Sequence, residues 1–235
     1  VNMYVDRDID ARMERTANRP LVTGVVTPRA ALTFALAIDA AAIVLLWRAV
    51  NPLSALIAFA AFACYVGVYT VWLKRRYTSN IVIGGAAGAA PVLIGWAAVT
   101  SGLGWAPWLL FALIFFWTPP HFWALAVKYR DDYASANVPM LPSVATLAAT
   151  ARKILNYTLI LVATSLLIAP VADLGWVYLV AALVSGGVFV WSAVAVLRSP
   201  TPRTAMALFG WSITYITVLF GAMAVDQLAG LAWPL

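Results

Sequence analysis

Long apolar stretches separated by short polar segments make up most of the chain. A helix needs about 20 residues to cross the hydrocarbon core of a membrane, which is roughly 30 Å thick. Seven stretches are long enough and apolar enough to do so. The pattern therefore predicts seven membrane-spanning helices, at residues 30–50, 52–73, 81–100, 105–127, 154–172, 174–197 and 204–225.

The composition supports a membrane protein. Of the 235 residues, 64% are hydrophobic and only 10% are charged, whereas about a quarter of the residues of soluble domains are charged. This excludes a water-soluble globular domain and a disordered chain. The single cysteine, Cys64, lies in an apolar stretch and cannot form an intrachain disulfide. We therefore expect an all-α, polytopic membrane helical bundle.

The basic residues fall almost entirely on one side of the predicted topology. If the spans alternate in direction, fourteen of the fifteen Lys and Arg residues share one side and Arg48 alone lies on the other. Basic loops of membrane proteins face the cytoplasm, so we predict that the basic side is cytoplasmic. The net charge of +6 is spread too thinly to form a nucleic-acid-binding groove. The expected surrounding partner is the lipid bilayer, and no nucleic acid is expected.

Polar residues at the start of the chain form a possible metal site. Asn2, Asp6 and Asp10 are spaced i, i+4 and i+8, which places them on one face of a helix. Carboxylate and amide oxygens bind hard cations such as Mg²⁺, which also takes ligands from substrate phosphates. The alternative is a solvated acidic helix end paired with Arg7, Arg12 and Arg15.

Basic residues occur close to these acids. Arg15 and Arg19 follow directly, and Lys74 and Arg75 form a second basic cluster in a loop predicted on the same side. Lys and Arg make charge-assisted hydrogen bonds to phosphate oxygens. The alternative for Lys74 and Arg75 is charge that only orients the spans in the membrane.

A second acidic pair lies in the longest loop on the predicted cytoplasmic side. Asp131 and Asp132 are adjacent there. Placed opposite the first acidic cluster, they would allow one or two metal ions to bind a diphosphate.

The only histidine, His121, follows Pro119 and Pro120 in an apolar stretch. We expect the prolines to break the helix, and an ionisable residue at such a point is a candidate functional residue. Imidazole is a frequent ligand of iron, including haem iron. The alternative is a neutral histidine hydrogen-bonded within the bundle.

Two other features have simpler expectations. Gly84, Gly85 and Gly88 lie in an apolar span, where we expect them to permit close helix packing. Asp39, within the first span, has no partner that the sequence identifies.

Several ordered segments resemble a known family. Residues 2–20, which contain Asn2, Asp6 and Asp10, resemble the first aspartate-rich motif of the UbiA-type intramembrane prenyltransferases. Residues 69–75 (YTVWLKR), 80–85 (NIVIGG), 119–123 (PPHFW) and 132–142 (DYASANVPMLP) resemble the protohaem IX farnesyltransferase (haem o synthase) group of that superfamily. The resemblance covers most of residues 1–142.

The resemblance implies one UbiA-type domain over residues 1–235, in a bundle of nine helices of which the first and most of the second precede Val1. It implies an active site facing the cytoplasm, in the inner (plasma) membrane of a bacterium. The implied activity is Mg²⁺-dependent transfer of a farnesyl group from farnesyl diphosphate to a vinyl group of haem b, which gives haem o. Haem o would pass to a terminal oxidase, directly or through haem a synthase.

The resemblance also assigns roles by position. Asp6, Asp10 and Asp132 would be catalytic and, with Asn2, would bind the metal. Arg15, Arg19, Lys74 and Arg75 would bind the diphosphate, and His121 would contact the haem substrate, as an axial ligand in one version.

The sequence departs from the superfamily pattern in two places. Asp131 and Asp132 are adjacent, whereas many members have two aspartates four residues apart, so the number of metal ions stays open. Tyr69 precedes Lys74 by five residues instead of four, so Tyr69 is not assigned as a phosphate ligand.

Three alternative functions remain. A related prenyltransferase could act on a phenolic or quinone precursor, although such a substrate gives His121 no iron to bind. A cation-coupled transporter would need a path of acidic residues through the membrane, and only Asp39 lies deep in a span. A purely structural membrane subunit would leave the acidic and basic clusters without a role.

Overall fold

The computed structural model describes residues 1–230, and these residues form helices and connecting loops with no strand. The all-α prediction is therefore confirmed. Two compact units can be distinguished. Unit 1 comprises Val1–Leu103 and Tyr129–Val144, and unit 2 comprises Gly104–Lys128 and the described residues from 145 onward.

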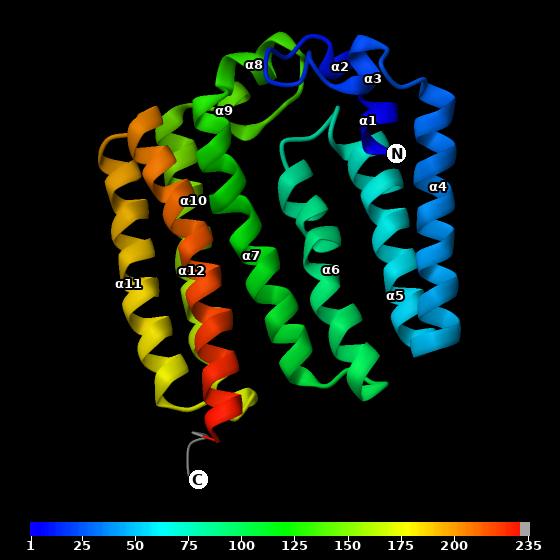
Figure 1. Ribbon diagram of the computed structural model, residues 1–235. Helices are drawn as coiled ribbons and strands as arrows, with labels where there is room; N and C mark the ends of the chain where they lie inside the picture. The colour runs from blue at the N-terminus through cyan, green and yellow to red at the C-terminus, as the bar shows by residue number, and fades with distance from the viewer. Residues whose placement is uncertain (231–235) are drawn as a thin grey trace. The chain divides into compact units, whose positions relative to one another are not determined.

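Unit 1 contains three membrane-spanning segments and a set of short helices. The spans are α4 (Pro28–Leu45) with the π-helix η1 (Leu46–Val50), α5 (Pro52–Ala63) with the π-helix η2 (Cys64–Leu73), and α6 (Asn80–Thr100). The short helices are α1 (Asn2–Val5), α2 (Arg7–Asp10), α3 (Pro20–Thr23), α8 (Arg130–Ser135) and α9 (Leu141–Val144). Figure 1 shows the short helices gathered at one end of α4, α5 and α6.

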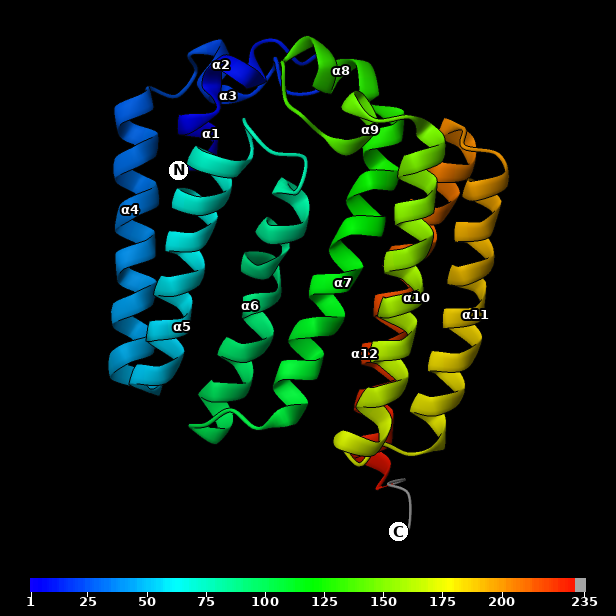
Figure 2. The same cartoon turned by 180° about the vertical axis from the view of Figure 1, so that it is seen from behind.

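Unit 2 is a bundle of four long helices. They are α7 (Trp105–Lys128), α10 (Leu147–Val171), α11 (Trp176–Arg198) and α12 (Pro202–Ala229). Helix α7 packs against α10 and α12, and α11 packs against the same two helices; Figure 2 shows this bundle from behind. Large apolar side chains, among them Trp123, Phe189 and Leu208, are fully buried between the helices.

Several helices begin with the same local arrangement. Thr27, Asn51 and Thr201 each accept a hydrogen bond from a backbone N–H of the first turn, and a proline follows each of them directly. The side-chain oxygen satisfies an N–H that has no partner within the helix, and proline at the first helical position loses no bond there. These residues fix where α4, α5 and α12 start.

The seven predicted spans are confirmed: within residues 1–230, seven helices are long and apolar enough to cross a membrane. The largest difference lies in the fifth, which begins at Leu147 and not at residue 154. Thr146 caps this helix by accepting a hydrogen bond from Ala149 N at 3.2 Å. Arg152 and Lys153 are exposed on its first turns, where long basic side chains can reach the membrane–water interface.

The predicted helix break at Pro119 and Pro120 is wrong. Both prolines lie inside α7, which is helical throughout. Each proline removes only one N–H, and the hydrogen bonds of neighbouring turns continue the helix. The Thr118 hydroxyl also donates to the Ile114 carbonyl at 2.8 Å. His121 therefore lies on a continuous helix, one turn after Trp117.

Gly84 lies where α6 packs closely against η2. A Cβ atom at this position would be 2.4 Å from Cδ2 of Tyr69, which confirms that Gly84 permits close packing.

Because the Tyr69 ring would have to move, we expect Gly84→Ala to lower the free energy of unfolding by about 1–3 kcal/mol, measurable by denaturant titration in detergent micelles. The same expectation is wrong for Gly88, because no atom lies within 4 Å of a Cβ placed there. Gly88→Ala is therefore the matched control. Equal losses in both variants would contradict the assignment.

Candidate functional site

Asn2, Asp6 and Asp10 follow one another at helical spacing as predicted, although the helix that carries them is interrupted. Asp6 separates α1 from α2, with φ −91° and ψ 10°. The backbone bonds from Asp6 N to Asn2 O (2.9 Å) and from Asp10 N to Asp6 O (2.8 Å) still join residues four apart. The Asn2 amide accordingly donates to Asp6 Oδ2 at 2.9 Å.

Asp6 is a completely buried carboxylate surrounded by cations. Its exposed fraction is 0%. Lys74 forms an ion pair with Oδ2, and Arg75 Nη2 lies 3.7 Å from Oδ1. Within the described residues, Oδ1 accepts no hydrogen bond. A buried carboxylate needs such partners. Lys74 and Arg75 supply them, and Oδ1 is left without a hydrogen bond from residues 1–230.

Asp10 has its own basic partner. Its side chain is almost fully buried, and Oδ2 accepts a hydrogen bond from Arg19 Nη1 at 2.7 Å. The Thr16 hydroxyl donates to the Asp10 carbonyl at 2.9 Å and holds the intervening turn. Arg19 therefore links Asp10 to the start of α3, and its partly exposed guanidinium is accessible from solvent.

Arg75 is held by Asp8, an acid between Asp6 and Asp10 for which no role was predicted. Both carboxylate oxygens of Asp8 accept from the Arg75 guanidinium, at 2.7 and 2.8 Å. The hydrogen bonds between Arg75 and Asp8 lower the pKa of the Asp8 carboxyl and raise the pKa of the Arg75 guanidinium. The stabilisation of the folded state by this ion pair is therefore present above the unfolded pKa of Asp8, about 3.9. It is lost as the pH falls through the lower pKa of Asp8 in the folded state. Because Asp8 is exposed, the pair contributes only about 0–1 kcal/mol.

The π-helix η2 changes how the spacing of Tyr69 and Lys74 must be interpreted. Lys74 N donates to Tyr69 O at 2.8 Å, so these residues are one π-helical turn apart. Five residues in a π-helix correspond to four in an α-helix, because the hydrogen bonds run from i+5 to i. The five-residue spacing therefore still leaves Tyr69 and Lys74 on the same side of the helix.

The segment that carries the second acidic pair packs against the turn that follows the first cluster. Asp132 Oδ1 accepts a hydrogen bond from Glu14 N at 3.4 Å, and the Ser135 hydroxyl contacts the Arg12 carbonyl at 3.4 Å. Ile9, Met13, Ala136 and Val138 form a small buried apolar cluster between these segments, with Tyr133 packed against it. Apolar packing thus fixes α8 beside α2 and the turn after it. Asp131 is exposed.

Arg15 lies beside tyrosines of the α8 segment. Its guanidinium is 5.5 Å from the centre of the Tyr129 ring, a cation–π distance. Burial raises the pKa of Tyr133, and nearby Arg15 opposes that rise. Arg15 therefore places positive charge beside the α8 segment, which carries Asp132.

His121 belongs to unit 2 and is nearly buried, with 8% exposed. Its ring is stacked between Trp117 and Phe209, at centroid distances of 4.1 and 4.4 Å. Nδ1 lies 2.6 Å from the Ser212 hydroxyl on α12. The alternative expectation, a histidine hydrogen-bonded within the bundle, therefore describes its surroundings correctly.

The oxygen donors in unit 1 suit a hard cation. Among residues 1–230, no group of three or more His, Cys, Asp and Glu side chains is arranged as a metal site. Mg²⁺, however, typically uses one or two carboxylates and completes its shell with water and substrate phosphate. The buried Asp6, with the unbonded Oδ1, and the neighbouring Asn2 amide fit this requirement.

Some residues of these sites carry no signal in the sequence. Thr70 accepts a hydrogen bond from Asn2 Nδ2 at 3.1 Å, and Ser212 contacts His121, yet both are ordinary hydroxyl residues in apolar spans.

Asp226 is a buried acid outside these sites, 2% exposed. Its carboxylate accepts a hydrogen bond from Tyr178 N at 2.8 Å, which caps the start of α11. Its role is structural.

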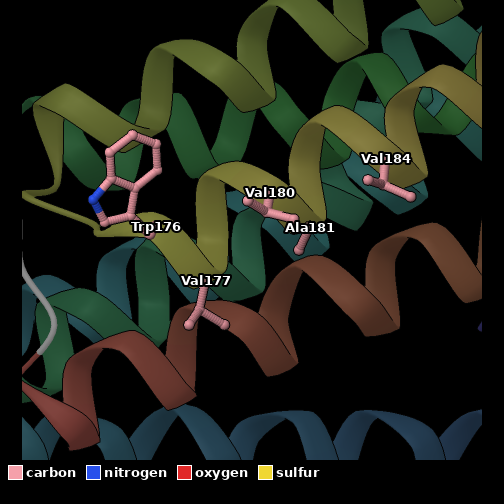
Figure 3. A pocket seen from close by; sticks show the side chains of 5 residues that line it. All are labelled: Trp176, Val177, Val180, Ala181 and Val184. Carbon is pink, nitrogen blue, oxygen red and sulfur yellow. The ribbon is translucent and has the colours of Figure 1, made fainter.

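A shallow apolar hollow on α11 does not belong to these sites. It is lined by Trp176, Val177, Val180, Ala181 and Val184, all from that one helix (Figure 3). Its lining offers no carboxylate, basic group or hydroxyl for chemistry. Exposed apolar side chains of this kind are suited to contact with lipid.

The helices define the class of protein: with seven candidate spans, this is a multi-pass membrane protein. Residues 1–225 match the UbiA prenyltransferase family, and the chain belongs to that family. It is therefore an enzyme that transfers prenyl groups.

Similar proteins agree in sequence and in structure. The chain is 56% identical to a protoheme IX farnesyltransferase of Frankia casuarinae, over 97% of this chain and 80% of the relative. It is 49% identical to proteins of the same name from Streptomyces avermitilis, over 96% of this chain and 76% of the relative, and from Gloeobacter violaceus, over 97% and 75%.

Two solved structures share the fold. A structure described for a digeranylgeranylglyceryl phosphate synthase has a TM-score of 0.79 at 17% identity, over 97% of this chain and 79% of that chain. A UbiA homologue from Aeropyrum pernix K1 has a TM-score of 0.68 at 21% identity, over 96% and 82%. The predicted UbiA-type fold is therefore confirmed.

Proposed function

We propose that this enzyme transfers a farnesyl group from farnesyl diphosphate to a vinyl group of haem b and so forms haem o. The observation that carries this proposal is the buried carboxylate of Asp6, with one oxygen unbonded, beside Lys74 and Arg75. The close relatives named protoheme IX farnesyltransferase support the choice of substrates.

The basic residues would bind the diphosphate. Arg19 contacts Asp10, and Lys74 and Arg75 contact Asp6. Arg15 lies beside the Tyr129 ring, at the start of the α8 segment that carries Asp132. Phosphate oxygens can replace or share these carboxylate partners, because both are anionic acceptors. Asp6 and Asp10, with Asn2 and Asp132, would hold Mg²⁺, which would supply positive charge to the leaving diphosphate.

The reaction would proceed by loss of diphosphate from the allylic carbon. The C–O bond breaks and its electron pair leaves with the diphosphate, whose charge Lys74 and the arginines stabilise. The vinyl π electrons of haem b then form the new C–C bond. Water supplies the hydroxyl group at the remaining cationic carbon and releases a proton, which balances the conversion to a hydroxyethylfarnesyl group.

The test is to incubate the purified protein in lipid nanodiscs with farnesyl diphosphate, haem b and Mg²⁺. Mass spectrometry of the extracted haems should detect haem o. A parallel reaction with a phenolic acid in place of haem should give no product. Prenylation of the phenolic acid alone would contradict the proposal and favour the related quinone-precursor enzymes. EDTA should stop haem o formation if a divalent cation is required.

We further propose that the chain lies in a bacterial inner membrane with the acidic and basic site facing the cytoplasm, where haem o is passed toward a terminal oxidase. The support is the basic charge of the segments at one end of the spans. In a Cys64→Ala background, Ser101→Cys should be labelled by an impermeant thiol reagent from outside the cell. Thr78→Cys, at the other end of α6 and also exposed, should be labelled only after lysis. The reverse pattern would contradict this orientation.

A further inference from the structure

The surroundings of His121 fix the plane of its ring. Trp117 and Phe209 lie on its two faces, with interplanar angles of 20° and 25°. Phe122 meets it edge-on, with a centroid distance of 5.1 Å. Rotation of the imidazole would require these aromatic rings to separate. Packing therefore fixes the plane of the ring, and the contact between Nδ1 and the Ser212 hydroxyl distinguishes this orientation from the one flipped by 180°.

Ser212 determines which nitrogen carries the proton. Its hydroxyl oxygen lies 2.6 Å from His121 Nδ1 and 2.6 Å from the Phe209 carbonyl oxygen. The hydroxyl has only one proton to donate. A carbonyl can only accept, so the short O···O contact needs that proton. The contact with His121 must then use a proton on Nδ1, donated to the Ser212 oxygen.

The backbone of Ser212 is held separately from its hydroxyl. The indole N–H of Trp117 donates to the Ser212 carbonyl at 2.8 Å. This bond joins α7 to α12 one turn before His121 and does not involve the Ser212 side chain. Loss of the hydroxyl would therefore leave the contact between the two helices in place.

We propose that Ser212 is a positioning residue that keeps neutral His121 in the form protonated on Nδ1 and presents the lone pair of Nε2 to the iron of the haem substrate. Within the described residues, Nε2 forms no hydrogen bond. Histidines that bind metals usually donate their other ring N–H to an acceptor, which fixes the tautomer and makes the ligand more basic. The identity of the ligand rests on the proposed function, whereas the tautomer does not.

The tautomer can be measured directly, because His121 is the only histidine of the chain. Selective ¹⁵N-histidine labelling of the protein in nanodiscs gives one pair of ring ¹⁵N signals. We expect Nδ1 to be protonated and Nε2 to have the shift of an unprotonated nitrogen, and we expect Ser212→Ala to change this pattern. A proton on Nε2 in the unaltered protein, or an unchanged pattern in Ser212→Ala, would overturn the proposal.

Titration with ferric haem b tests the role toward substrate. We expect Ser212→Ala to weaken haem binding about 10–100-fold and to shift the Soret band. Ser185→Ala, which removes a buried hydroxyl bonded within α11, should leave both unchanged. If His121→Ala alters the spectrum and Ser212→Ala does not, the role of Ser212 is refuted. If neither alters it while the tautomer is as expected, the assignment of His121 as a ligand of the haem iron is refuted instead.

Discussion

Replacing Asp6 by Asn should abolish prenyl transfer, with a fall in kcat/KM of about 10³-fold, the scale of losing one electrostatic contact to a reacting group. The amide has almost the same shape, so the change removes mainly the buried negative charge that Lys74 and Arg75 surround. Production of haem o from farnesyl diphosphate and haem b, followed by mass spectrometry, is the measurement.

The control for this variant is Asp8→Asn, which makes the same charge change two residues away. Asp8 is exposed, and Arg75 keeps its hydrogen bond to the Val5 carbonyl (2.9 Å) when Asp8 is lost. We expect activity within about tenfold of the unaltered enzyme, since exposed ion pairs contribute little. Similar activity in the two variants would show that Asp6 does not act on the substrate.

Lys74→Met should lower the free energy of unfolding by about 3 kcal/mol, because it leaves the buried Asp6 without its nearest cation. We take the lower end of the usual range for a broken buried pair, since the Lys74 side chain is 15% exposed. Denaturant titration of the detergent-solubilised protein is the measurement. Arg76→Met, at an exposed neighbouring position, should change stability by no more than about 0.5 kcal/mol.

The double variant Asp6→Asn/Lys74→Met separates stability from chemistry. With both charges removed, no unpaired ion is buried, so much of the stability lost in Lys74→Met should return. Prenyl transfer should remain absent. A double variant as unstable as the sum of the single variants would mean that the two side chains are not energetically coupled.

The sequence predicted the parts of this protein that depend on local pattern. The lengths of the apolar stretches are sufficient to define the seven spans, and the i, i+4 spacing correctly places the Asn2 amide against Asp6. The topology predicts both acidic groups on one side of the membrane, and the structure places Asp132 against the backbone N–H of Glu14, four residues after Asp10. The alternative pairing of the acids with Arg7, Arg12 and Arg15 differs from the pairs with Arg19, Lys74 and Arg75 that are found.

Other features depend on contacts between distant segments. Ser212 lies 91 residues from His121, and a serine in an apolar helix gives no sign of which neighbour it will meet. The continuity of α7 through Pro119 and Pro120 depends on hydrogen bonds in the surrounding turns, which proline content alone does not reveal. Similarly, α8 is fixed beside α2 by four apolar side chains and Tyr133, which belong to two segments far apart in the chain.

The π-helical form of residues Cys64–Leu73 makes this segment sensitive to a change in length. Deleting one residue between Tyr69 and Lys74 would allow an ordinary α-helix to form there. Each residue of an α-helix corresponds to a turn of about 100°, so the preceding part of the span would rotate by roughly that angle about its axis relative to Lys74. Asn51 and Ser54 would then turn away from the α6 carbonyls to which they donate.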